Sequence, residues 1–229
     1  VDENLFDIVR TIPDPKFDYE DKIRYLRHTP FKKTLFLDCD THVCSNFLEL
    51  FDLLDTFDFA AAHEPGRISL KRNETLEDKR VHLQDIPACF SEFNTGVILF
   101  NNVKTVLDLF DQWLDLYRAF KDQCEHDQPS LLAANYRSKF RFYVLPPEYN
   151  VKFHTCCFVS GDAKILHGRI SDITAAQVNP QNAFSILDRC INENKGCRCL
   201  FPEFGIIMGT GEFGFNLAND ITVKKTTLR

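Results

Sequence analysis

Two carboxylates one residue apart are the residues of this chain whose type and spacing best suit chemistry. Asp38 and Asp40 follow directly on Lys33–Leu37, where three large apolar residues predict a strand. A continuous apolar run is typical of a buried strand of a parallel sheet, and ligands bind at the carboxyl ends of such strands. With no Lys or Arg beside them in sequence, the carboxylates repel unless a cation lies between them. The pair therefore indicates a Mg²⁺ or Mn²⁺ site, with an Asp pair capping the next helix as the alternative.

The elements that must position this pair alternate between strands and helices, which predicts an α/β fold. The strongest helix pattern is Val103–Phe120, in which Trp113 is expected to be a core anchor. Arg67–Asp85 is polar and is expected to be a surface excursion or a mobile loop. Further strands are predicted at Phe6–Ile12, Phe57–Ala62, Phe93–Phe100, Phe140–Leu145 and Ala163–Leu166. Further helices are predicted at Tyr19–His28, Cys44–Leu54 and Asp127–Asn135.

Composition narrows the class of protein. The chain has 229 residues, enough for one domain with a substantial core, and 44% of them are hydrophobic, including 22 Phe. The formal charge of −6 argues against a nucleic-acid partner, which would require a basic face. No apolar run approaches the roughly 18 residues of a membrane span.

Cysteine content bears on the compartment. Nine cysteines in no regular framework favour reduced thiols and a cytoplasmic location. Cys190, Cys197 and Cys199 lie close together in sequence, but no further ligand stands at finger-like spacing, so a zinc site is not expected there. The sequon at Asn73 would matter only in the secretory-pathway lumen, the alternative location if a targeting segment is missing from the N-terminus.

Several motifs occur in an order that resembles the GT-A fold glycosyltransferases, most closely the glycogenin-like and nucleotide-diphospho-sugar transferase groups. The resemblance runs from about Lys22 to Arg169 and implies a Rossmann-like mixed sheet flanked by helices. The motifs are Lys22 ahead of the strand, Leu-Asp-Cys-Asp-Thr, Phe-Asn-Thr-Gly-Val, Asp-Gln, Leu-Pro-Pro-Glu-Tyr-Asn and Lys-Ile-Leu-His-Gly-Arg.

The resemblance implies a metal-dependent transferase that moves a sugar from a nucleotide-diphosphate sugar, with uridine as the expected base. The acceptor would be a hydroxyl of a saccharide, a protein or a small molecule. Asp38 and Asp40 resemble the metal-binding pair of these enzymes, and His167 resembles the third ligand of Mn²⁺ or Mg²⁺. Imidazole is an acceptable ligand for Mn²⁺. A surface-loop histidine is the alternative for His167.

The same resemblance assigns donor-binding roles. Lys22 and Arg169 would bind the diphosphate, where positive charge stabilises the leaving group. If the reaction retains configuration, as in the glycogenin-like groups, Asp127 would position or stabilise the sugar; if it inverts, Asp127 would be the general base. The alternatives are a solvated helix face for Lys22, a surface position for Arg169 and an N-cap for Asp127. The donor-binding set is Lys22, Asp38, Asn94, Gly96, Asp127, Gln128, Gly168 and Arg169, of which Lys22, Asp127 and Gln128 are the catalytic candidates.

Two further groups of residues follow predicted strands without a strong motif. Glu148, Tyr149 and Asn150 follow a Pro-Pro turn and are expected to shape the acceptor side. His63, Glu64 and Arg67 are expected to line the cleft.

The domain prediction is a GT-A domain over residues 1–175 and a C-terminal extension over residues 176–229. Only 37 residues precede Asp38, so the first βα unit is expected to be missing. Two other functions stay open. A haloacid-dehalogenase-like phosphatase also has Asp-x-Asp after a strand, although His42 departs from its pattern. The second open function is that of a catalytically inactive GT-A-like binding module.

Overall fold

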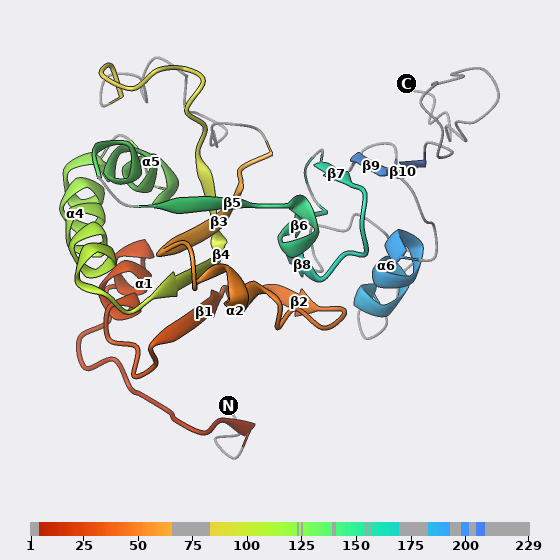
Figure 1. Cartoon of the computed structure of the whole chain (residues 1–229), viewed down its shortest axis with the longest axis horizontal. Coiled ribbons are helices and arrows are strands. Elements are labelled where there is room, and N and C mark those ends of the chain that lie inside the picture. The colour runs from red at the N-terminus through yellow and green to blue at the C-terminus, as the bar shows by residue number, and fades with distance from the viewer. Residues whose placement is uncertain are drawn as a thin grey trace.

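A mixed four-stranded sheet lies at the centre of the molecule (Figure 1). β4 runs antiparallel to both of its neighbours, whereas β3 and β5 are parallel, so the predicted mixed α/β sheet is confirmed. The strand order is β1 (Lys33–Leu37), β4 (Phe93–Asn101), β3 (Phe59–His63) and β5 (Phe142–Leu145). The computed structural model describes residues 5–65, 83–122, 124, 126–138, 141–153, 155, 157–169, 183–192, 198–201 and 205–208.

The central strand β4 is buried along nearly its whole length. Ile98 and Phe100 pack into the core on one face of the sheet, and Val97 and Leu99 pack into the core on the other. Because both faces of β4 are covered, its stretch Val97–Phe100 is continuously apolar rather than alternating.

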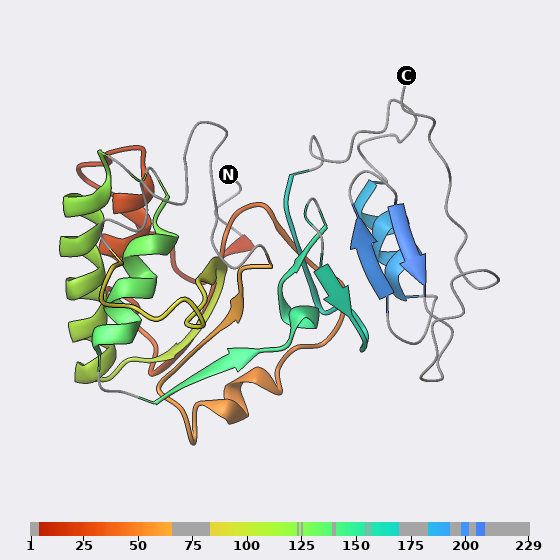
Figure 2. The same ribbon diagram turned by 90° about the horizontal axis from the view of Figure 1, so that it is seen from above.

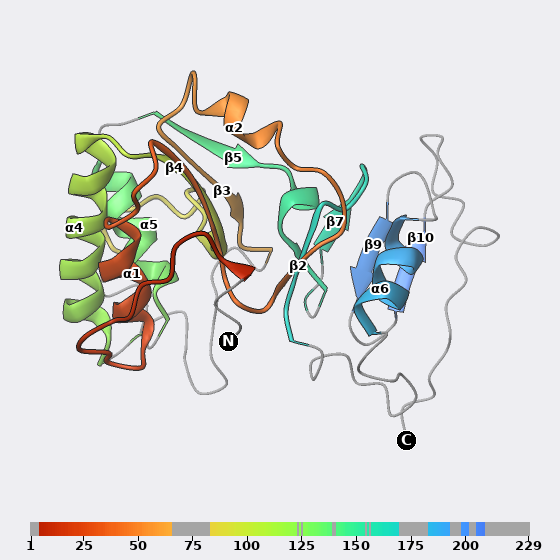
Figure 3. The same ribbon diagram turned by 90° about the horizontal axis from the view of Figure 1, so that it is seen from below.

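Helices cover the two faces unequally. α1 (Tyr19–Leu26), α4 (Lys104–Phe120) and α5 (Gln128–Arg137) lie together on one side (Figure 2). The short α2 (Leu50–Leu53) lies on the other side (Figure 3). On α4, Val106, Leu109, Phe110 and Tyr117 face the core, and Trp113 is completely buried, as expected for a core anchor.

Two smaller sheets extend the molecule beyond the ends of β3 and β5 (Figure 1). One contains β2 (Thr41–Val43), β8 (Ile165–His167) and β6 (Val151–Lys152), the last preceded by the 3₁₀ turn η2 (Pro147–Tyr149). The other contains β7 (Cys157–Val159), β9 (Arg198–Phe201) and β10 (Gly205–Met208).

Part of the predicted C-terminal extension packs against the rest of the molecule. α6 (Ala183–Asn192) buries Ile191 beside Ala163, and the Asn192 amide hydrogen-bonds the Ala163 backbone. β9 pairs with β7. A division at residue 175 stays a prediction.

Three sequence expectations are wrong. β1 is a half-buried, antiparallel edge strand of the described sheet, not a buried strand among parallel neighbours, because an apolar run identifies a strand but not its partners. Phe6–Ile12 is not a strand, and Phe6, Ile8 and Val9 are exposed. The helix predicted at Cys44–Leu54 is reduced to α2, because the segment before it follows the end of β2 in loops and turns.

The other predicted strands and helices within the described residues are present, with ends shifted by a few residues. Arg67, the sequon at Asn73 and Cys197 lie outside the described residues.

Candidate metal centre

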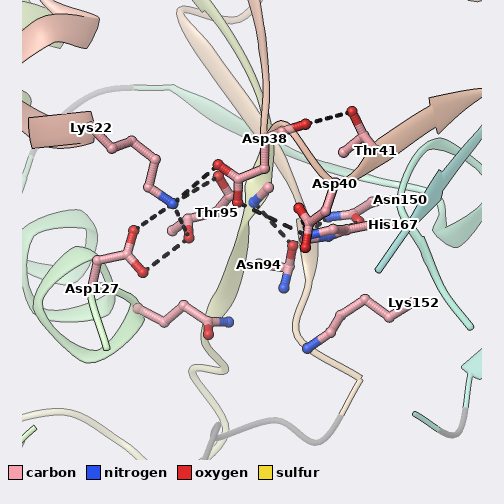
Figure 4. A network of polar contacts seen from close by, with 12 residues as sticks. Lys22, Asp38, Asp40, Thr41, Asn94, Thr95, Asp127, Asn150, Lys152 and His167 are labelled. Atoms are coloured by element: carbon pink, nitrogen blue, oxygen red, sulfur yellow. Dashed lines mark hydrogen bonds and ion pairs between the residues drawn. The ribbon is translucent and has the colours of Figure 1, made fainter. Parts of the chain in front are cut away.

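Asp38, Asp40 and His167 bring their ligand atoms together just beyond the end of β1 (Figure 4). These atoms all lie within 4.8 Å of one another. His167 Nε2 is 3.4 Å from Asp40 Oδ1 and 3.9 Å from Asp38 Oδ2. Ligands about 2.1 Å from one octahedral ion are roughly 3.0 Å apart when adjacent and about 4.2 Å apart when opposite. Both distances fall between these limits, so the three side chains fit one divalent ion.

Strand pairing brings His167 to the aspartates. The first residue of β2, which follows Asp40, lies opposite His167 in the antiparallel pairing of β2 with β8. The Asp38 N–H donates to the Gly96 carbonyl at 2.8 Å, which holds the end of β1 on β4. The Gly168 N–H donates to the Asp40 carbonyl at 3.0 Å, and Gly168 has a φ of 142°, a conformation that favours glycine.

Gly96 leaves room for the His167 ring. A Cβ at position 96 would lie 2.0 Å from His167 Cε1, which is too close for any side chain. Gly96 was predicted to bind the donor. The structure places a protein side chain there, and contact between Gly96 and a donor stays a prediction.

A second charged cluster adjoins the first, between α1 and α5. Lys22 Nζ lies 2.8 Å from Asp127 Oδ2 and 3.5 Å from Asp38 Oδ1 (Figure 4). It also donates to Thr95 Oγ1 at 2.9 Å, and that hydroxyl donates to Asp127 Oδ1 at 3.1 Å. Lys22 therefore joins a candidate metal ligand to the start of α5, and it is not a solvated residue of a helix face.

Negative charge exceeds positive charge across these two clusters. Burial, reinforced by the charges of Asp127 and Asp40, raises the pKa of Asp38 from 3.8 to about 6, although Lys22 opposes the shift. Burial also lowers the pKa of Lys22, but Asp127 and Asp38 outweigh it and raise that pKa overall. No Lys or Arg lies beside the Asp pair in sequence, but the fold brings Lys22 to Asp38. One lysine among three carboxylates still leaves an excess of negative charge that a divalent ion would balance.

Asp127 occupies the N-cap position of α5, but its side chain makes no capping hydrogen bond. The side chain turns instead to Lys22 and Thr95. The Asp127 carbonyl accepts from Trp113 Nε1 at 2.9 Å and from Ser130 Oγ at 2.7 Å. The core tryptophan thus also fixes the backbone of a candidate site residue.

A buried ion pair lies beside the metal cluster. Lys152 Nζ donates to both carboxylate oxygens of Glu64 at 2.9 Å. Asn94 Nδ2 and Gln128 Nε2 donate to Glu64 Oε2 at 2.9 and 2.7 Å. Burial alone would raise the pKa of Glu64, but Lys152 and the two amides lower it. Glu64 therefore holds two of the predicted donor-binding side chains in place.

The remaining predicted residues lie around this centre. Arg169 is exposed. Burial raises the pKa of the Tyr19 hydroxyl, and the positive charge of Arg169 opposes this shift without cancelling it. Glu148 accepts a hydrogen bond from the Gly161 N–H at 2.7 Å, and the Tyr149 hydroxyl donates to Glu49, the residue before α2. These two therefore hold neighbouring loops, and a role for them on the acceptor side stays a prediction.

Three residues of the site were missed or assigned elsewhere from the sequence. Thr95 lies inside the Phe-Asn-Thr-Gly motif, so that motif could have drawn attention to it. Asn150 was assigned to the acceptor side, but its Oδ1 lies 2.9 Å from His167 Nδ1. Lys152 follows it on β6, and no sequence signal marks it as the partner of Glu64.

The mixed sheet, the Asp-x-Asp pair after β1 and the histidine supplied by β8 define a glycosyltransferase domain of the GT-A fold. A family model described as glycosyl transferase family 8 matches residues 23–167, well over half of the chain. The chain belongs to this family. The predicted fold and enzyme class are confirmed, and the phosphatase alternative is set aside.

Solved structures of glycosyltransferases are similar to the chain at low identity. GlyE of Streptococcus pneumoniae TIGR4 is 24% identical over 57% of this chain and 29% of its own, with a TM-score of 0.40. The galactosyltransferase LgtC, solved with donor and acceptor sugar analogs, is 19% identical over 65% and 51%, with a TM-score of 0.40. Mouse xyloside xylosyltransferase 1 in its apo form is 16% identical over 67% and 63%, with a TM-score of 0.46.

The chain spans less than two-thirds of the length of each of these proteins. No curated protein matches it significantly. Within the part of the chain that the structure describes, no helix is both long and apolar enough to cross a membrane.

Proposed function

We propose that this chain forms the donor site of a metal-dependent enzyme that transfers a sugar from a nucleotide-diphosphate sugar, with UDP as the nucleotide, to an acceptor hydroxyl. The observation that carries this proposal is the convergence of Asp38, Asp40 and His167 beside Lys22, in a chain that belongs to glycosyl transferase family 8. The acceptor would be a saccharide, a protein or a small molecule.

Asp38, Asp40 and His167 would hold the metal, Mn²⁺ or Mg²⁺. When bound, the ion would act as a Lewis acid and neutralise charge on the diphosphate leaving group. Hard divalent ions commonly combine a few protein ligands with substrate phosphates, so three protein ligands leave positions for the donor. The imidazole among the three favours Mn²⁺ over Mg²⁺.

Lys22 would supply positive charge beside the metal. Its side chain is buried, and the neighbouring carboxylates raise its pKa, so the ammonium stays charged at neutral pH. A charge held in a largely dehydrated site stabilises a leaving group more than the same charge in water. Arg169, exposed near Tyr19, has the guanidinium geometry that suits phosphate oxygens.

Asn94, Asp127 and Gln128 would orient the sugar. Each is already fixed by a buried partner, Glu64 for the two amides and Lys22 for the carboxylate. Side chains held in this way can position a reacting sugar without a large loss of entropy on binding. Asp127 would position or stabilise the sugar if configuration is retained, and would be the general base if configuration is inverted.

The compartment proposed for the protein is a reducing one such as the cytoplasm. Cys39, Cys44 and Cys89 are present as thiols, which persist where disulfides are kept reduced. Fractionation of cells that express the tagged protein would test this, and recovery with secretory vesicles would contradict it.

The test is a panel of nucleotide-sugars with the protein, with and without Mn²⁺, followed by thermal unfolding and by release of nucleoside diphosphate. We expect one donor to raise the melting temperature and to release nucleoside diphosphate, in both cases only with metal. Asp40→Asn should lose both responses, with turnover reduced at least about 1000-fold, because a metal contributes several kcal/mol to charge stabilisation.

The matched control is Asp108→Asn, the same substitution at an exposed position on α4. This variant should respond as the wild type does. Donor binding without turnover would favour the inactive binding module. No response to any donor would contradict the proposed function.

A further inference from the structure

Asn150 connects the buried Glu64 cluster to the candidate metal ligand His167. Its Nδ2 lies 2.7 Å from Asn94 Oδ1, and its Oδ1 lies 2.9 Å from His167 Nδ1 (Figure 4). Asn94 is in turn bonded to Glu64 through Nδ2. All four side chains are buried, so a continuous chain of hydrogen bonds shielded from solvent ends at the metal centre.

The orientation of the Asn94 amide follows from its partners. The backbone N–H of Gly96 can only donate, and it lies 3.0 Å from Asn94 Oδ1, so this atom must be the amide oxygen. The opposite atom faces the carboxylate of Glu64 at 2.9 Å, as a donor should. The low pKa of Glu64, set by Lys152 and the two amides against the effect of burial, keeps that acceptor ionised. Asn94 therefore cannot flip without losing two buried hydrogen bonds.

The orientation of Asn150 follows from that of Asn94. Because Asn94 Oδ1 is an acceptor, the Asn150 atom that faces it must be the amide nitrogen. The Asn150 oxygen then faces His167 Nδ1 and can only accept. The proton of a neutral His167 ring is assigned to Nδ1 by this sequence of partners.

With the proton on Nδ1, the lone pair of His167 lies on Nε2. This is the ring atom 3.4 Å from Asp40 Oδ1 and 3.9 Å from Asp38 Oδ2. The ring also packs against Gly96, where a Cβ would lie 2.0 Å from Cε1. The hydrogen bond sets the tautomer, and this contact restricts rotation of the ring.

We propose that Asn150 is a positioning residue that, held by Asn94, keeps His167 protonated on Nδ1 and so directs the Nε2 lone pair into the metal centre. Only the link to the metal rests on the proposed function. The tautomer itself is a property of the metal-free chain. Partners that orient a ligating histidine typically contribute about 10- to 100-fold to metal affinity.

The first experiment measures the tautomer directly in the metal-free wild type. Long-range ¹H–¹⁵N correlation spectra of histidine-labelled protein, recorded where the ring is neutral, distinguish protonated from unprotonated ring nitrogens. The His167 signals are assigned with His167→Gln. We expect Nδ1–H, whereas an unconstrained imidazole favours Nε2–H. A His167 ring protonated on Nε2 would overturn the proposal without the use of any Asn150 variant.

The second experiment varies Asn150 and measures Mn²⁺ affinity from the signal of free Mn²⁺ in electron paramagnetic resonance. Asn150→Ala should shift His167 towards Nε2–H and weaken Mn²⁺ binding about 10- to 100-fold. Asn150→Asp keeps an acceptor for Nδ1, so it should retain the Nδ1–H tautomer and recover most of the affinity. Tyr149→Phe is the matched control, because it removes a hydrogen bond of the neighbouring residue to Glu49 instead.

The outcomes separate the two proposals. An Asn150→Ala variant that keeps both the tautomer and the affinity would overturn the positioning role, as would equal losses in Asn150→Ala and Asn150→Asp. A wild type with the Nδ1–H tautomer that binds no Mn²⁺ would support the hydrogen-bond chain and contradict the proposed metal dependence.

Discussion

Two acidic clusters lie side by side in this molecule and differ in how their charge is balanced. Glu64 is paired with Lys152 and accepts hydrogen bonds from two amides, and its pKa is lowered despite burial. Asp38 shares Lys22 with Asp127 and lies near Asp40, and burial together with these carboxylates raises its pKa to about 6.

The difference shows which cluster is complete. A buried charge persists when a partner and hydrogen bonds replace the water it has lost. The Glu64 cluster meets that condition with protein groups alone. The Asp38 cluster has one lysine for three carboxylates, and a bound cation would balance the excess of negative charge. The first cluster can therefore support the site, and the second contains the residues proposed to hold the ion.

The largest expected effect on stability comes from breaking the balanced cluster. Glu64→Gln leaves the ammonium of Lys152 buried without a carboxylate, which should reduce the free energy of unfolding by about 3–5 kcal/mol. Urea unfolding followed by circular dichroism measures this. Adding Lys152→Met to the variant should recover most of the lost free energy of unfolding, since neither position of the pair then carries a buried charge. A single variant as stable as the wild type would show that the pair is not a structural support.

A smaller effect on stability, with no loss in the metal-free protein, is expected from a substitution in the Asp38 cluster. Asp38→Asn removes one of the crowded carboxylates, so the metal-free protein should be at least as stable as the wild type. Mn²⁺ at 100 times its Kd should stabilise the wild type by about 2.7 kcal/mol, and this gain should vanish in the variant. Thermal unfolding with Mn²⁺ and with a chelator measures both.

Asp52→Asn is the control for this prediction, because Asp52 is an exposed aspartate on α2. It should keep the full response to Mn²⁺. Destabilisation of the metal-free protein by Asp38→Asn would mean that Lys22 already balances the cluster.

The smallest expected effect is a difference in pH dependence. The pKa of Glu64 lies below its ordinary value of 4.5, so its ionised form contributes stability above about that pH. The contribution is lost as the pH falls through the folded-state pKa. The free energy of unfolding, measured with urea from pH 7 to pH 3, should therefore fall more steeply for the wild type than for the double variant Glu64→Gln with Lys152→Met. Parallel curves would argue against the lowered pKa.

Much of the site could be predicted because its residues lie in short motifs. Asp38, Asp40 and His167 were named as ligands from the sequence, and the structure brings them together. Lys22 was expected to bind the donor, but its place between Asp38 and Asp127 depends on the packing of α1 against α4, which no motif shows. Their functional roles remain predictions.

Strands were harder to predict than the long helix. α4 follows from apolar residues at helical spacing, a pattern internal to one segment. The apolar run at Phe6–Ile12 suggested a strand, but no strand of the described sheet pairs with it. A strand needs a neighbour for its hydrogen bonds, and a local pattern cannot say whether that neighbour exists.

The sequence by itself determined the carboxylate pair at the end of an apolar strand, the long amphipathic helix and the family of the protein, because each depends on residues close together in the chain. Only the tertiary structure decided which lysine faces which carboxylate and which nitrogen of His167 faces the metal centre. Those outcomes depend on strand pairing and burial. Electrostatic energies vary with the distance and the surroundings of each charge, and these arise only when distant segments pack together.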